Sequence, residues 1–110
     1  MCTRIDKERS SYLEVALRLL NTAINMAERY GDRVLKARAE FALGQYYESQ
    51  ASLHSDKKLQ QASLHDARRL IHGAANGLLG WGMKLESSDA INFLERRVET
   101  YIERLEEHKM

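Results

Sequence analysis

The chain has 110 residues, of which 44% are hydrophobic and 30% are charged, a composition typical of one folded domain rather than two. A net charge of +1 argues against a strong electrostatic footprint for nucleic acids or membranes. The absence of proline favours long helices over an all-β fold, and the single cysteine, Cys2, excludes an intramolecular disulfide and a cysteine-based zinc site.

The N-terminal segment carries charge where a secretion signal would carry apolar residues. Residues 1–9 hold five charged side chains and no apolar run, and no stretch approaches the roughly 18 apolar residues of a membrane span. We therefore expect a cytoplasmic protein that has no membrane contact. A single domain is expected over residues 1–110, in which residues 1–10 are a candidate disordered arm.

The first predicted helix begins at Ser11, which stands three residues before Glu14 in the spacing of a capping box. An apolar stripe then recurs at three- and four-residue steps along one helix face. Its members are Leu13, Ala16, Leu17, Leu20, Ala23, Ile24 and Ala27. Gly31 suits the left-handed conformation that ends a helix.

A second helix is expected directly after Asp32, a residue type that caps helix N-termini. Its apolar positions lie on more than one side, which indicates neighbours on both sides. They are Leu35, Ala39, Ala42, Leu43 and Tyr46, broadened by Val34, Phe41 and Tyr47. The polar run at residues 54–58 predicts a loop after this helix.

A third helix is expected from Leu59 to about Leu79, and its end is rich in glycine. Each glycine inside a helix costs roughly 1 kcal/mol relative to alanine, so this end should be the weakest helical segment. Trp81 and Met83 stand in the following turn. Both residue types are favoured in partner contacts, although closing the core is the commoner role for such a tryptophan.

The last predicted helix is capped by Ser87 or Ser88. Its apolar residues are spaced 3-4-3-4, which is the heptad seam of a coiled coil. The seam consists of Ile91, Leu94, Val98, Tyr101 and Leu105. Two heptads are too short for an independent coiled coil, so the seam should pack on the first three helices or on a second copy of the chain. We predict a homodimer through this seam.

Charge is distributed unevenly along the chain. Residues 1–38 contain eight basic and five acidic side chains, whereas residues 86–110 contain four basic and seven acidic ones. This asymmetry favours contact between the first and last helices, within one chain or between two.

The first helix junction resembles a tetratricopeptide repeat of the longer kind. Residues 23–32 resemble the end of a B helix, and the small residues and Leu-Gly-x2-Tyr pattern of an A helix follow. These positions are Ala37, Ala39, Leu43, Gly44 and Tyr47. The spacing of a B helix recurs at Ala67, Ile71 and Ala74 and, upstream, at Ala16, Leu20 and Ala23. The resemblance covers about one and a half repeats, Ala16 to Ala74.

Several features depart from that family's pattern. Glu40 stands where an aromatic residue is usual, no proline closes the repeat, and the stretch from Tyr47 to Ala67 is about a dozen residues too long. The resemblance implies an array of helical hairpins with a concave peptide-binding face. An antiparallel four-helix bundle obeys the same local packing rules and is the alternative. The expected class is therefore all-α, with four antiparallel helices.

No set of residues completes a catalytic or metal-binding site. His65 and His72 share a helix face, but the Glu-x-x-His pairs of di-iron bundles are missing. Arg68 and Arg69 lie too close to His72 for the ribonuclease spacing of small helical toxins, and no phosphate loop is present. We expect no enzyme, no cofactor and no metal ion.

The sequence thus favours a protein-interaction module, an adaptor, chaperone-like factor or regulator that binds a peptide or helix of another protein in a helical groove. Candidate partner-binding residues are Arg38, Gln45, Tyr46, Trp81 and Met83. A self-assembling helical protein is one alternative. A small nucleic-acid-binding regulator is the other, although acidic residues dilute its basic pairs.

Overall fold

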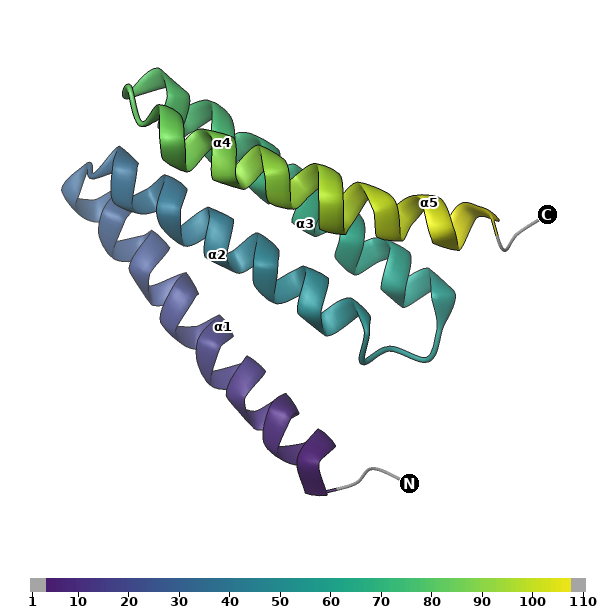
Figure 1. Ribbon diagram of the computed structural model, residues 1–110. Coiled ribbons are helices and arrows are strands. Elements are labelled where there is room, and N and C mark those ends of the chain that lie inside the picture. Colours follow the sequence, from purple (N-terminus) through teal and green to yellow (C-terminus); the bar gives the residue numbers. More distant parts are fainter. Residues whose placement is uncertain (1–3, 108–110) are drawn as a thin grey trace.

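The computed structural model describes the backbone of residues 4–107 and the side chains of residues 11–107, so Cys2 lies outside it (Figure 1). Three helices come first, α1 (Arg4–Tyr30), α2 (Arg33–Ala51) and α3 (Lys57–Gly80). The last helix is continuous over residues 84–107 and comprises α4 (Lys84–Phe93), a π-helical segment η1 (Leu94–Glu99) and α5 (Thr100–Glu107). The predicted all-α class with four helices is confirmed.

Each helix packs mainly on the one that precedes it. α2 lies between α1 and α3, and α3 also packs along the whole last helix. α1 makes its extensive contacts in the described chain with α2, and it diverges from the last helix towards its N-terminal end (Figure 1). The side of α1 that faces away from α2 therefore has no extensive contact with another helix in the described chain.

The junction between α1 and α2 follows the predicted pattern. Gly31 takes a φ of 70°, and the Asp32 amide donates to the Ala27 carbonyl at 2.8 Å, as in a Schellman motif. The Asp32 carboxylate then accepts from the Leu35 amide at 3.0 Å and caps α2. Both sequence predictions at this junction are confirmed.

The same device ends α3. Gly82 has a φ of 79°, and the Met83 amide donates to the Leu78 carbonyl at 2.9 Å. α4 consequently begins at Lys84 with Met83 as its N-cap, and Met83 offers no side-chain hydrogen bond there. The prediction of a cap at Ser87 or Ser88 is wrong. Ser87 is buried inside α4 and donates its hydroxyl to the Ala75 carbonyl of α3 at 2.8 Å, so its side chain serves a neighbouring helix.

The start of the first helix also differs from the prediction. α1 begins at Arg4, so Ser11 lies inside it and the capping-box interpretation is wrong. Residues 4–10, which the sequence suggested as part of an N-terminal arm, are helical. The physical reason is that this segment contains good helix formers and neither proline nor glycine. Nothing in it therefore prevents the helix from beginning before Ser11.

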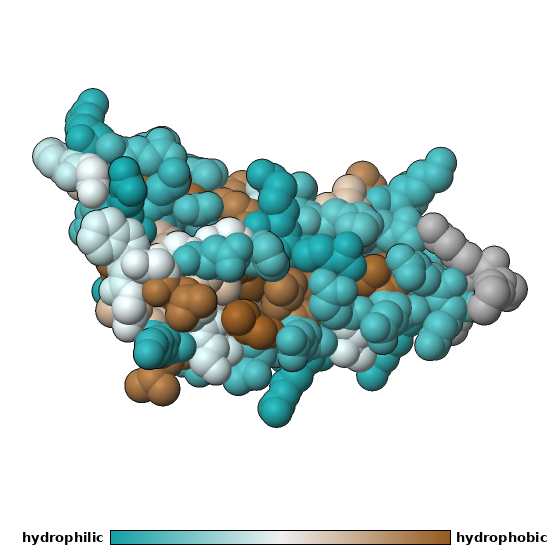
Figure 2. Space-filling view, turned by 90° about the horizontal axis from the view of Figure 1, so that it is seen from above, coloured by the Kyte–Doolittle hydropathy of each residue, from teal (hydrophilic) through white to brown (hydrophobic). Residues whose placement is uncertain are grey.

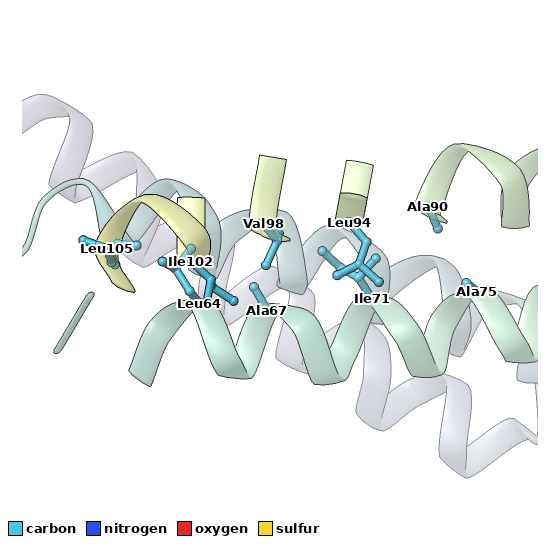
Figure 3. Close-up of a cluster of buried hydrophobic side chains, with 10 residues drawn as sticks. Leu64, Ala67, Ile71, Ala75, Ala90, Leu94, Val98, Ile102 and Leu105 are labelled. Atoms are coloured by element: carbon cyan, nitrogen blue, oxygen red, sulfur yellow. The ribbon is translucent and has the colours of Figure 1, made fainter. Parts of the chain in front are cut away.

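The core lies between α3 and the last helix (Figure 3). Its buried members are Ala51, Leu64, Ala67, Ile71, Ala75, Ala90, Leu94, Val98, Ile102 and Leu105. Four of them are alanines, and such small side chains let the helix axes approach closely. At the α2–α3 crossing the two helices lie close together at Gly44, where an added Cβ would collide with the Ile71 side chain and lie 3.3 Å from the Ala67 carbonyl oxygen.

The last helix contributes its core residues in steps of four, from Ala90 through Leu94 and Val98 to Ile102. In a regular α-helix each step of four turns the side chain by roughly 40° beyond a full turn, so three steps would carry it off the core face. The wider π-helical turn at η1 removes that drift. Of the predicted seam, Ile91 is 40% exposed and Tyr101 is half-buried against the core, while Ile102, which was not assigned to the seam, lies in the core.

Candidate functional site

α1 carries apolar side chains on two adjacent faces, and only one of them has a neighbour. The predicted stripe from Leu13 to Ala27 faces α2, and most of it is half-buried. A second apolar stripe, which we call the outer face, remains exposed by 51% to 76%. It consists of Tyr12, Val15, Leu19, Met26 and Tyr30. At 100° per residue these five positions lie within about 60° of one another, so they form one straight row.

Together the two stripes make α1 apolar over roughly 200° of its circumference. A helix of that kind normally has neighbours on both apolar sides. Within the described chain the outer face has no extensive partner, because α1 packs mainly on α2. Large side chains aligned in this way, rather than scattered singly, are typical of an interaction surface. This face was not predicted from the sequence, because a single apolar stripe was assigned to the helix.

A second candidate surface lies where the end of α2 meets η1 and α5. A pocket of about 400 Å³ opens there, and we call it the arginine pocket. Its lining residues are Glu48, Ser49, Ser52, Arg96, Arg97, Thr100, Tyr101 and Arg104. The Arg97 guanidinium is held by the Glu48 carboxylate at 3.3 Å and lies 5.9 Å from the Phe93 ring centroid. Sequence reasoning missed this pocket because its two walls are about fifty residues apart in the chain.

Arg38 and Tyr46, two of the three predicted groove residues of α2, make contacts within the chain. Arg38 forms a two-pronged ion pair with Glu86 of α4 at 2.7 and 2.6 Å. These hydrogen bonds raise the pKa of Arg38 and lower the pKa of Glu86. Tyr46 is 6% exposed, burial raises its pKa, and its ring meets that of Tyr47 edge-on. Gln45 is half-buried. The structure therefore does not bring these three residues together as a free binding surface.

Trp81 is 57% exposed at the turn between α3 and α4, whereas Met83 beside it is half-buried. Trp81 borders a shallow groove of about 670 Å³ between the start of α2 and the end of α3. The groove is lined by Arg33, Lys36, Ala37, Glu40, Gly73, Asn76, Gly77, Gly80 and Trp81. At Gly73 and Gly80 a Cβ would meet nothing within 4 Å, so the α3 backbone is open to an approaching group.

The face seen from above the last helix is mainly hydrophilic, with hydrophobic side chains gathered towards its middle (Figure 2). Three residues of the predicted dimer seam, Leu94, Val98 and Leu105, are buried in the chain's own core. Of the other two, Tyr101 lines the arginine pocket and Ile91 is partly exposed. Most of the seam is thus engaged by α3.

Two further features are absent from the described residues. No cluster of three or more histidine, cysteine, aspartate or glutamate side chains able to hold a metal ion is present among them. Nor does this part of the chain include a helix whose length and apolarity would let it cross a membrane.

Comparisons with protein-family models, with curated proteins and with solved structures found no match to this chain. The resemblance to tetratricopeptide repeats therefore stays a prediction.

Proposed function

We propose that this chain is a protein-interaction module and that α1 binds the partner through its outer face. The observation that carries the proposal is the row from Tyr12 to Tyr30, five large apolar side chains that stay exposed beside an already packed stripe. The partner of matching chemistry is an apolar helix laid along α1, because a straight row of apolar side chains along one helix accepts the ridges of another helix.

Leu19 lies near the middle of the row and is 66% exposed. Interface residues near the centre of a patch contribute most of the binding free energy, because the surrounding contacts exclude water from them. A charge at Leu19 should thus abolish binding while leaving the fold intact, since its side chain makes little contact within the chain.

The experiment compares Leu19→Glu with Leu85→Glu as a matched control. Leu85 is 84% exposed in α4, away from α1, so the control adds the same charge elsewhere. Partners captured by the parent chain are identified, purified and titrated against all three proteins. We expect the partner to bind the parent chain and Leu85→Glu with equal affinity and not to bind Leu19→Glu. Equal binding by both variants would overturn the assignment to α1, and matching melting curves establish that both are folded.

One observation favours self-assembly as a second candidate. The two ends of the outer face are symmetric about Asn21, since Tyr12 and Tyr30 lie nine residues to either side of it. Two antiparallel copies of α1 that cross at Asn21 would therefore place Tyr12 of each copy opposite Tyr30 of the other, as a twofold interface requires. Light scattering over a concentration series separates the candidates. A dimer that Leu19→Glu dissociates supports self-assembly through α1, whereas a parent that stays monomeric excludes it.

A further inference from the structure

The arginine pocket lies away from α1 and plays no part in the proposed partner binding. It contains three guanidinium groups, those of Arg96, Arg97 and Arg104, and one carboxylate, that of Glu48. Glu48 is engaged with Arg97, and no ion pair is formed by Arg96 or Arg104 within the described residues. We propose that this pocket is a binding site for a phosphate monoester.

The shape of the last helix explains why these side chains converge. Arg96, Thr100 and Arg104 follow one another in steps of four, as the core residues Leu94, Val98 and Ile102 do. The π-helical turn that keeps the core residues in line also aligns the arginines with the threonine on an outward-facing strip. Thr100 donates its hydroxyl to the Glu95 carbonyl at 3.1 Å, five residues back, which ties the strip to the widened turn. π-helical turns occur frequently at functional sites.

Two acidic groups at the pocket, those of Glu99 and Glu48, have basic partners of their own. Glu99, on the same turn, is held by Arg68 of α3 through two hydrogen bonds of 2.7 and 2.9 Å. Glu48 is nearly buried and fixes Arg97 in place, so it positions one guanidinium at the cost of one negative charge. The side chains that line the pocket consequently carry a net charge of +2.

That charge selects among anions. A phosphate monoester carries about −1.5 to −2 at pH 7 and has three terminal oxygens, so it matches both the charge and the number of guanidinium groups. A carboxylate or a phosphodiester carries a single negative charge and leaves one arginine uncompensated. The Ser49 and Tyr101 hydroxyls supply neutral donors at the pocket wall. The volume of about 400 Å³ also leaves room for the group that the phosphate esterifies.

The test titrates the full chain with inorganic phosphate, with phosphoserine and with a phosphoserine peptide, followed by calorimetry and by the NMR signals of the Tyr101 ring. The variant is Arg96→Gln with Arg104→Gln, and the control is Arg18→Gln with Arg29→Gln, which removes the same charge from α1. We expect saturable binding that shifts the Tyr101 signals. The variant should weaken it by roughly tenfold for each guanidinium, since charge-assisted hydrogen bonds of this kind have that strength.

The three ligands separate the sources of the phosphate. A peptide that binds more tightly than phosphoserine identifies a phosphorylated protein, whereas equal affinities identify a small phosphorylated molecule, and both support the site. The proposal is overturned if the control loses as much affinity as the variant, because binding then follows overall charge. It is also overturned if no ligand shifts Tyr101, or if single-stranded RNA binds there and phosphoserine does not compete.

Discussion

Gly44 sets the distance between α2 and α3. The Ile71 side chain occupies the space that a Cβ would take, and the Ala67 carbonyl lies just behind it. The Leu43-Gly44 dipeptide predicted a close helix approach from the sequence, and the structure confirms it. A glycine inside a helix is unfavourable by itself, so its presence there is explained only by the neighbour it admits.

We expect Gly44→Leu to lower the free energy of unfolding by at least about 2 kcal/mol, because the new side chain must displace Ile71. Gly73→Ala is the matched control, since Gly73 also lies within a helix but has open space around it. There the substitution should raise stability by roughly 0.5–1 kcal/mol through helix propensity. Urea unfolding of both variants measures the difference. A Gly44→Leu protein as stable as the parent would contradict the packing described above.

The partner of Arg38 could not be predicted, because nothing local in the sequence links it to Glu86, 48 residues away. The ion pair lowers the pKa of Glu86 in the folded chain relative to the unfolded one. The stabilising contribution is therefore present above the unfolded value of 4.5 and is lost as the pH falls through the lower folded value.

Glu86→Gln is accordingly expected to reduce stability near neutral pH and to flatten its dependence on pH below 4.5. Because both side chains are exposed to solvent, the effect should be small. Arg38→Met should flatten the same acid region, and the double variant should add nothing further. Thermal melts over a pH series measure this. Additive effects of the two substitutions would show that the pair is not coupled.

At the scale of elements, the last helix shows where sequence periodicity becomes ambiguous. Apolar residues at 90, 91, 94, 98, 101, 102 and 105 fit both a heptad and a row in steps of four. The heptad assumes a regular helix and selects Ile91 and Tyr101, whereas the π-helical turn selects Ala90 and Ile102. Packing against α3 determines which pattern is realised, and a single sequence does not contain that information.

The two patterns predict different losses in the free energy of unfolding when Ile91 or Ile102 is shortened to alanine. Ile102 is 3% exposed, so Ile102→Ala should cost about 2–5 kcal/mol by leaving a cavity against α3. Ile91 is 40% exposed, so Ile91→Ala should cost less than about 1 kcal/mol. Chemical denaturation of the two variants checks the order. A larger loss of stability for Ile91→Ala than for Ile102→Ala would favour the regular heptad over the row in steps of four.

At the scale of the whole molecule, the helices form a flat arrangement with one loosely covered layer. The radius of gyration is 14.9 Å, whereas a compact domain of this length has about 13 Å. The molecule extends 43 × 32 × 19 Å, and its thinnest extent is less than two helix diameters of about 10–12 Å each. The sequence predicted the number and approximate limits of the helices. It could not predict this openness, because apolar residues on two sides of α1 fit a covered helix equally well.

This openness should be visible in local stability. Amide hydrogens of residues 11–20 in α1 should exchange much faster than those of residues 64–75 in α3, because α1 packs extensively on one helix and α3 on two. Hydrogen exchange followed by mass spectrometry measures both segments in one sample. Equal protection in a dilute monomeric sample would show that α1 and α3 open as one cooperative unit.

The exposure of Trp81 has a spectroscopic consequence. It is the only tryptophan, and its indole already faces solvent for more than half of its surface in the folded chain. The wavelength of its emission should therefore change little when the chain unfolds. A thermal melt followed by fluorescence should show a smaller transition than one followed by circular dichroism. The same indole borders the groove beside Gly73 and Gly80, so a blue shift of its emission would reveal any molecule that covers that end of α3.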